Sequence, residues 1–318
     1  MHTSQDKIRI NKFVNHYCEG IYCGLGDFLN VSEEYYDNIL SLLSLQEKET
    51  VIEYAVAKNV QAGVGSLNIK VPEFGMGLKL LDKYHLKGRE IVTAKKYAQM
   101  PTSSLVGGRT MLDIESLVDY NQDLLSAISD FSARADVPLA IELASDLENV
   151  GKIVNTYLSS PAEVLESFGL LDRECFVYGL NYLDKDDQKI VKDYDKTCIF
   201  SPQSDGKRGM GAINLFNFIY HRLKFGFSSG KCYNVDMLFE GKLAVLNTFN
   251  LMHESGNIST EEVLDSLTDK SDDEIELDLF QEENIDNIWD KKVHKKVEEF
   301  DSIQKKTIEI ARKIKEKI

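Results

Sequence analysis

The chain has 318 residues, of which 43% are hydrophobic, so it can bury a substantial core as one barrel or as two smaller domains. Its formal net charge of −15 argues against a nucleic-acid surface, because phosphate binding requires clustered Lys and Arg. No apolar run of about 18 residues occurs, so we expect no membrane span. The five cysteines include no CxxC pair, and the polar start of the chain has no signal-peptide core. Both features favour a cytoplasmic protein with reduced thiols.

The first third of the chain alternates between short apolar runs and helical patterns. A strand comes first, and Gly20, Gly24 and Gly26 then indicate a long loop. Between residues 100 and 109 a strand is needed, but few residues there suit one. The expected strands are Ile8–Val14, Val64–Ile69, Glu90–Ala94 and Ser103–Val106, and the expected helices are Gln46–Gln61 and Gly75–Leu86.

The alternation is clearer from Ile114 to His253. The expected strands there are Val137–Leu143, Cys175–Tyr178, Thr197–Phe200 and Phe225–Ser228. The expected helices are Ile114–Ala133, Leu147–Leu158, Ala162–Phe168, Asp184–Asp193, Ala212–Lys224 and Val235–His253. About eight strand–helix units result, as a (β/α)8 TIM-like barrel requires. The short, wholly apolar strands fit a parallel sheet that is buried on both faces. A doubly wound open sheet is the alternative, but no GxGxxG follows any strand.

The character of the chain changes after residue 258. Residues 1–258 therefore form the expected barrel, 259–287 an acidic helix and linker, and 288–318 a charged amphipathic helix. In the middle segment we expect a helix at Thr260–Thr268 and a solvated linker at Asp269–Asp286. The last segment carries one apolar stripe among many charges. Such a stripe favours packing on the helix's own domain or on a partner subunit over a free coiled coil.

Four motifs in order resemble the amidohydrolase superfamily, in its cytosine deaminase, guanine deaminase and chlorohydrolase-like branch. Ser160-Pro161-Ala162-Glu163-Val164-Leu165-Glu166-Ser167-Phe168-Gly169-Leu170-Leu171 is similar to the P-x-x-x-L-x-x-x-G-L-L run before barrel strand 6. Tyr178 to Asp187 resembles the "hL-x-x-x-D" element. The loop Ser201-Pro202-Gln203-Ser204-Asp205-Gly206-Lys207-Arg208-Gly209-Met210-Gly211 looks like N-P-x-S-N-x-x-L-x-x-G. Ser228-Ser229-Gly230-Lys231 stands where the family has G-T-D-G.

The resemblance implies a metal-dependent hydrolase barrel with degenerate metal ligands. In the family an HxH follows strand 1, single histidines follow strands 5 and 6, and an aspartate follows strand 8. The corresponding residues here are His16-Tyr17-Cys18, Glu142, Gly179 and Gly230. Glycine has no side chain with which to bind metal. Neutral imidazoles bind Zn²⁺ or Fe²⁺ and leave the bound water acidic, so their loss predicts no metal cofactor. The alternative is one Zn or Fe on His16, Cys18 and Glu142.

Other polar residues at the expected strand ends are candidates for a pocket. The family's general-acid glutamate corresponds to Ser145, with Asp146 beside it, and we expect Glu142 to pair with Lys231 or Arg208, because an isolated buried carboxylate is costly. The alternative for each of two residues is a structural role: His16 would form a hydrogen bond in the barrel mouth, and Cys18 would be a small core residue. The full candidate set is His16, Cys18, Glu142, Ser145, Asp146, Asn181, Ser204, Asp205, Ser229 and Lys231.

Three classes of function follow from this sequence. The first is an amidohydrolase-like barrel, lacking the family's flanking β-sandwich, that has lost its metal and hydrolytic activity. It would bind a small molecule or assemble with itself or with an active relative, without nucleic acid or membrane. The second is an active hydrolase or deaminase of a small cyclic or amide substrate with a rearranged metal site. The third is a structural subunit joined through residues 288–318. Fold analogy alone names no ligand.

Overall fold

The computed structural model describes residues 5–29, 33–97, 108–255, 258–269, 274–280, 288–289 and 293–317. Eight strands form one sheet in chain order, β2 to β9, and the strand pairs within each unit described below run parallel. This is the strand order of a (β/α)8 barrel, as the sequence predicts. The strands are β2 (Phe13–Glu19), β3 (Val64–Lys70), β4 (Glu90–Thr93), β5 (Thr110–Ile114), β6 (Leu139–Glu142), β7 (Cys175–Tyr178), β8 (Thr197–Phe200) and β9 (Lys224–Phe227).

The chain divides into two compact units, each described here by itself. The first comprises residues 1–88, 228–242 and 260–318, and the second comprises residues 89–227 and 243–259. Helices of the first part of the chain are α1 (Gly20–Leu25), α2 (Glu33–Leu42), α3 (Leu45–Gln61), α4 (Met76–Lys83) and α5 (Ala94–Tyr97). The middle part contains the 3-10 helix η2 (Leu117–Asp119), α6 (Gln122–Ala135), α7 (Leu147–Tyr157), α8 (Pro161–Ser167), α9 (Lys185–Asp193), α10 (Pro202–Arg208) and α11 (Leu215–Tyr220). The last helices are α12 (Met237–Met252), α13 (Thr260–Leu267) and α14 (Phe300–Lys315).

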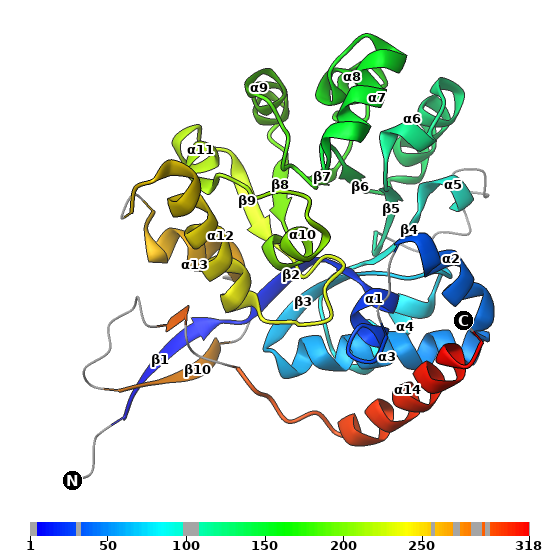
Figure 1. Cartoon of the computed structure of the whole chain (residues 1–318), viewed down its shortest axis with the longest axis vertical. Coiled ribbons are helices and arrows are strands. Elements are labelled where there is room, and N and C mark those ends of the chain that lie inside the picture. The colour runs from blue at the N-terminus through cyan, green and yellow to red at the C-terminus, as the bar shows by residue number, and fades with distance from the viewer. Residues whose placement is uncertain are drawn as a thin grey trace. The chain divides into compact units, whose positions relative to one another are not determined.

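The second unit keeps the predicted alternation most faithfully. In Figure 1, helices α6 to α9 and α11 fan outwards from strands β5 to β9. Strands β6 to β8 have buried apolar centres, as expected for a parallel sheet covered on both faces, whereas in β9 only Gly226 and Phe227 are buried. Helix α8 begins with Pro161 at its first turn, and Ser160 and Glu163 form a capping box. These local signals are why the sequence places the elements correctly here.

Strand β5 differs from the prediction. The sequence assigns Ile114 to a long helix, whereas Thr110–Ile114 is a buried strand, followed by η2 and then α6. The expected strand at Ser103–Val106 lies outside the described residues. Strand β5 contains Asp113, whose side chain is fully buried and accepts a hydrogen bond from the Tyr178 hydroxyl at 2.8 Å. A charged residue inside the strand conceals its apolar character from a pattern analysis.

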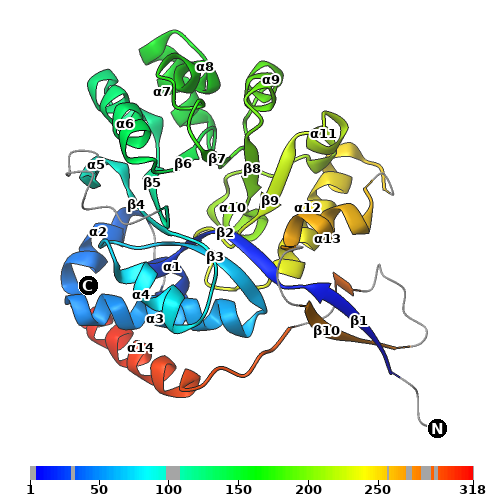
Figure 2. The ribbon, with the colours of Figure 1, turned by 180° about the vertical axis from the view of Figure 1, so that it is seen from behind.

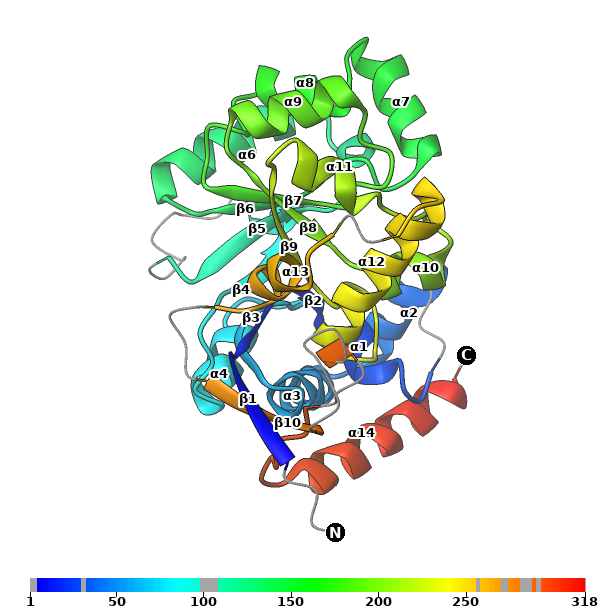
Figure 3. The same cartoon turned by 90° about the vertical axis from the view of Figure 1, so that its left-hand side faces the viewer.

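In the first unit, the first strand and the acidic linker form a small separate sheet. Residues Gln5–Asn11 are strand β1, which pairs antiparallel with β10 (Glu274–Phe280), as Figure 3 shows. The barrel strand is instead Phe13–Glu19, and the expected glycine loop is helix α1. Glu274–Phe280 is thus a strand inside the segment expected to be a solvated, partly ordered linker, because it alternates acidic and apolar residues, the period of a strand, within a strongly acidic stretch. In the described part of the chain, β1 and β10 are the strands outside the eight-stranded sheet.

Helix α14 packs along α3 within the first unit, as Figures 1 and 2 show. Its buried residues are Ile303, Thr307, Ile310, Ala311 and Ile314. The Tyr54 ring lies 5.4 Å from the Phe300 ring, and the Gln304 amide donates to the Tyr54 hydroxyl at 3.1 Å. The apolar stripe is therefore used within the helix's own unit, one of the two roles that the sequence favours.

Candidate functional site

In the first unit, the segment after β9 closes against β2. The Gly230 amide donates to the Tyr17 carbonyl at 2.9 Å, and the Glu19 amide donates to the Gly230 carbonyl at 2.9 Å. Gly230 has a φ of 54°, in the left-handed region that favours glycine. The position that the resemblance assigns to the strand 8 aspartate is thus bound to β2 through its backbone.

A buried polar network of Asn15, Asn59 and Ser229 lies beside Gly230. The Asn15 amide nitrogen donates to Asn59 Oδ1 at 2.7 Å and to Ser229 Oγ at 2.8 Å, and the Ser229 amide donates back to Asn15 Oδ1 at 3.0 Å. All three side chains are buried. Sequence analysis finds Ser229 but misses Asn15 and Asn59, because a lone Asn in a strand or helix carries no motif. The network fixes the strand end and fully occupies the Asn15 amide.

His16 and Cys18 have different neighbours, although only Tyr17 separates them in β2. The pairing of β2 with β3 shifts register between Asn15 and Cys18. Burial lowers the pKa of His16 to about 4, and Asp269 opposes this weakly. The Cys18 sulfur instead accepts hydrogen bonds from Cys23, Ser229 and Asn59 side chains. The charged group that acts on His16 therefore differs from the side chains that hydrogen-bond Cys18.

Glu19 is a buried carboxylate at the end of β2 that the sequence analysis misses. It accepts a hydrogen bond from the Tyr22 amide at 2.7 Å and one from the Tyr36 hydroxyl at 2.5 Å. Burial raises its pKa, which the charges of Lys70 and Lys231 oppose. The Lys231 ammonium also lies 5.7 Å from the centre of the Tyr22 ring. The sequence signal that could have identified Glu19 is a charged residue between an apolar strand and Gly20.

In the second unit, Glu142 ends β6 and Gly179 follows β7, so both occupy the strand ends that the resemblance implies. Gly179 has a φ of 68°, and a Cβ added to it would lie 3.0 Å from Ser145 Cβ and 3.1 Å from Glu142 Cγ. A side chain at this position would therefore be both strained and crowded. The pairing of Glu142 with Lys231 or Arg208 stays a prediction.

Asp146 has a structural role at the start of α7. Its carboxylate accepts hydrogen bonds from the Asn149 amide at 2.7 Å and from the Asn149 side chain at 2.6 Å. It also accepts one from the Ser145 hydroxyl at 3.3 Å. These are the contacts of a helix N-cap, so both carboxylate oxygens are occupied.

The predicted loop at Ser201–Gly211 is largely helix α10. Pro202 occupies its first turn, and Gly209 ends it with a φ of 67°, so the turn-like residues are helix start and stop signals. Ser204 is buried on this helix. Asp205, Asn181 and Gly211 line a cavity of about 10 Å³, which suits one water-sized molecule. Both amide atoms of Asn181 are buried and lack a hydrogen-bond partner within the described residues.

Across residues 5–29, 33–97, 108–255 and the shorter described segments, no three His, Cys, Asp or Glu side chains are grouped as a metal site requires. His16 and Cys18 lie in the first unit and Glu142 in the second, so the alternative ligand set stays a prediction. Among the residues that the structure describes, no helix has the length and apolarity to cross a bilayer.

No protein-family model matches the sequence. A 5-methylthioadenosine/S-adenosylhomocysteine deaminase from Caldicellulosiruptor saccharolyticus is 26% identical over 104 residues, which cover 33% of this chain and 24% of that protein. The match therefore spans about a quarter of the curated relative's length.

Solved structures show the similarity of fold over nearly the whole chain. An adenosine deaminase from Xanthomonas campestris with bound zinc has a TM-score of 0.78 and 10% identity, covering 98% of this chain and 87% of that one. Guanine deaminase from C. acetobutylicum with bound guanine has a TM-score of 0.71 and 10% identity, covering 96% and 83%. Atrazine chlorohydrolase from Arthrobacter aurescens TC1, complexed with zinc, has a TM-score of 0.63 and 15% identity, covering 82% and 70%. The chain therefore has the barrel fold of these solved deaminases and of the chlorohydrolase, which is the fold that the sequence motifs predict.

Proposed function

We propose that this protein is a metal-free relative of the deaminase-like amidohydrolases, which binds a small molecule or assembles with another barrel instead of hydrolysing a substrate. The observation that carries the proposal is Gly179. It stands at the strand 6 histidine position, and Ser145 and Glu142 crowd the space that a side chain would need. A missing ligand whose space is filled is harder to restore than a simple substitution.

The other donors support the same conclusion. A catalytic zinc site uses three protein ligands, most of them imidazoles. Here Gly230 contributes only its backbone, which is hydrogen-bonded to β2. Cys18 is hydrogen-bonded to three other side chains, and Asp146 caps a helix. The residues present do not fit the family's metal, so the proposed function includes no metal-dependent hydrolysis.

The small-molecule role rests on what the strand ends retain. Asn181 has an amide with both atoms unpartnered beside Asp205, in the region that resembles the substrate loop. An unpartnered buried amide is costly unless something satisfies it. Assembly with a second copy or with an active relative, in a cytoplasmic setting, remains part of the proposal.

The rival is an active metal-dependent hydrolase. Its support is that His16 is present at the HxH position and that similar solved structures contain zinc. It requires His16, Cys18 and Glu142 to bind one metal after a rearrangement that frees the Cys18 sulfur.

The direct test is release of ammonia from guanine, adenosine and 5-methylthioadenosine, with and without added zinc. We expect no release above buffer, and the same background for the wild type and for His16→Asn. Catalytic turnover that zinc increases and His16→Asn abolishes would establish the rival. Thermal shift with the same compounds tests binding separately from turnover.

A further inference from the structure

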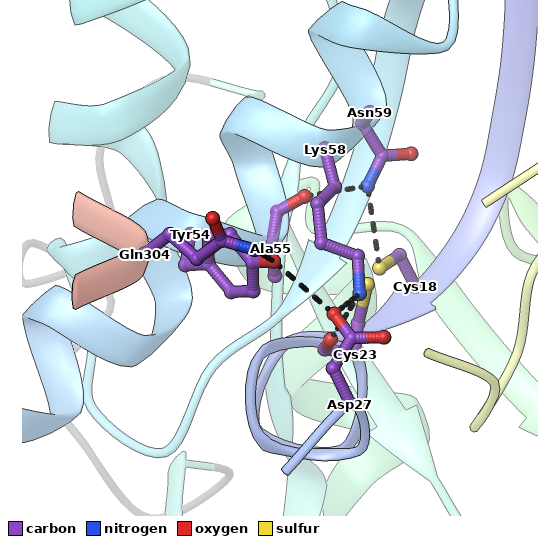
Figure 4. Close-up of polar contacts among 8 residues, drawn as sticks. All are labelled: Cys18, Cys23, Asp27, Tyr54, Ala55, Lys58, Asn59 and Gln304. Atoms are coloured by element: carbon purple, nitrogen blue, oxygen red, sulfur yellow. Dashed lines mark hydrogen bonds and ion pairs between the residues drawn. The ribbon is translucent and has the colours of Figure 1, made fainter. Parts of the chain in front are cut away.

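Two buried thiols meet where β2 gives way to α1. Cys18 lies in β2 and Cys23 in α1, both are completely buried, and the Cys23 thiol donates a hydrogen bond to the Cys18 sulfur. Figure 4 shows their sulfur atoms next to each other. Because only four residues separate them in sequence, a bond between the sulfurs would close a small loop at this turn.

The surroundings of Cys18 are unlike those of an ordinary core cysteine. Asn59 Nδ2 lies 3.7 Å from its sulfur, and Asn59 is itself held by the Ala55 carbonyl at 2.9 Å. Three side chains, those of Cys23, Ser229 and Asn59, hydrogen-bond the Cys18 sulfur. Cys198 in β8 is equally buried but lies outside this pair of thiols. Donors around the sulfur stabilise a thiolate, the reactive form of cysteine.

A cation lies beside the second thiol. The Lys58 ammonium donates to the Cys23 carbonyl at 2.9 Å and to Asp27 Oδ2 at 2.7 Å, as Figure 4 shows. Its charge counteracts part of the rise in the pKa of Cys23 that the hydrogen bond to Cys18 and burial cause. Lys58, Asp27 and Tyr233 also line a cavity of about 240 Å³. The cavity reaches the Lys58 ammonium, which contacts the Cys23 carbonyl, but the two buried thiols do not line it, so a small oxidant must pass this contact to reach them.

We propose that Cys18 and Cys23 form a redox-active dithiol that a peroxide oxidises to an intramolecular disulfide. The Cys18 thiolate attacks one peroxide oxygen, the O–O bond breaks, and the leaving hydroxide takes up the proton that Cys18 lost on ionising, so that Cys18 becomes a sulfenic acid and the first water forms. Cys23 then attacks the Cys18 sulfur, the S–O bond breaks, and a second water leaves with the Cys23 proton. One hydrogen peroxide and two thiols yield one disulfide and two waters.

Oxidation would act on the strand end through Asn59. A disulfide removes the sulfur's ability to accept the Asn59 and Ser229 hydrogen bonds as a thiolate does. Asn59 and Ser229 are the two partners of the Asn15 amide. The redox state of the thiols is thereby coupled to the network that fixes β2. This inference does not depend on the proposed binding role, but it rests on the metal-free Cys18 sulfur of the proposed function.

The test is thiol mapping of the full chain before and after hydrogen peroxide. The protein is quenched, unfolded, alkylated and cut with chymotrypsin, because cleavage after Tyr22 separates the two cysteines. We expect alkylated thiols to fall from five to three, a linked pair of peptides containing Cys18 and Cys23, and full recovery with dithiothreitol. Cys198 is the internal control and should remain fully alkylated.

Two variants sharpen the result. Cys23→Ser should give a Cys18 sulfenic acid that dimedone labels, without a disulfide, whereas Cys198→Ser should form the disulfide like the wild type. Because the wild-type map stands by itself, poor folding of Cys23→Ser would not remove the test. The proposal is overturned if Cys18 and Cys23 both remain alkylated after peroxide, or if Cys198 is oxidised at the same rate.

Discussion

At the scale of single residues, Gly179 is the position whose substitution is most informative. Its left-handed φ and the closeness of Ser145 and Glu142 mean that even one added methyl group would be strained and would require its neighbours to shift. Gly179→Ala should lower the free energy of unfolding by about 2–4 kcal/mol, combining backbone strain with overpacking. Urea denaturation measures this loss.

Gly206 in α10 provides the matched control. An added Cβ there meets nothing within 4 Å, and its φ is not left-handed. Gly206→Ala should be neutral or stabilising by up to about 1 kcal/mol, since alanine is the better helix residue. Equal changes in stability at the two glycines would contradict the conclusion that neighbouring atoms and a left-handed φ make a side chain at position 179 unfavourable.

The raised pKa of the buried Asp187 carboxyl group predicts that the stability of the protein depends on pH. Asp187 is 2% exposed, accepts a hydrogen bond from the Ala162 amide at 3.2 Å, and is hydrogen-bonded by the Ser160 hydroxyl. Burial raises its pKa from 3.8 to about 6. The folded state therefore holds this proton more tightly than the unfolded state. Its contribution is full below pH 3.8 and is lost as the pH rises through about 6.

Asp187→Asn should therefore gain stability relative to the wild type as the pH rises from 4 to 7. The difference in unfolding free energy between the variant and the wild type should change by at most about 3 kcal/mol over this range, because each tenfold change in proton affinity corresponds to about 1.4 kcal/mol. Groups common to both proteins cancel in this comparison. Chemical denaturation at several pH values measures it, with the exposed Asp186→Asn as control, and a pH-independent difference would refute the assignment.

At the scale of elements, α14 contributes to the stability of its own unit. Ile310 is 6% exposed on the face that packs along α3. Ile310→Ala should cost about 2–5 kcal/mol, because it removes buried methylene groups and leaves a cavity. The exposed Lys306→Ala should change little. Thermal melts distinguish the two, and matching melting temperatures would show that the α14–α3 contact carries no stability.

The elements also show what the sequence can and cannot reveal. Strands β7 and β8 have the bounds predicted from apolar runs, and Glu142, Gly179 and Gly230 fall at or just beyond the ends of β6, β7 and β9, as the resemblance implies. Strand β5 was missed because Asp113 interrupts its apolar pattern, and β10 because its charge resembled a linker. Helix α10 was mistaken for a loop because Pro202 and Gly209 also suit a turn.

The candidate site was harder to foresee than the fold. Asn15, Asn59 and Ser229 come from distant parts of the chain, so their shared hydrogen bonds follow from tertiary structure alone. The same holds for Asp113 and Tyr178, which lie on different strands of the second unit. Motif spacing identified the strand ends, but it could not show which polar groups would satisfy one another there.

At the scale of the whole molecule, the fold is that of solved deaminases, one of them with bound zinc, and Gly179 and Gly230 stand where the sequence resemblance implies metal ligands. The similarity to an adenosine deaminase structure covers 98% of this chain at 10% identity. A barrel can keep its strand order while its strand ends acquire other contacts, because the fold depends on burial and register and chemistry depends on a few side chains.

The metal content of the purified protein tests this account most directly. Protein from zinc- and iron-supplemented medium is dialysed against metal-free buffer, and its zinc and iron are measured by inductively coupled plasma mass spectrometry. His16→Asn is treated in parallel. The account predicts only trace metal, well below one atom per chain and equal in both proteins. About one zinc or iron per wild-type chain, lost in His16→Asn, would contradict it.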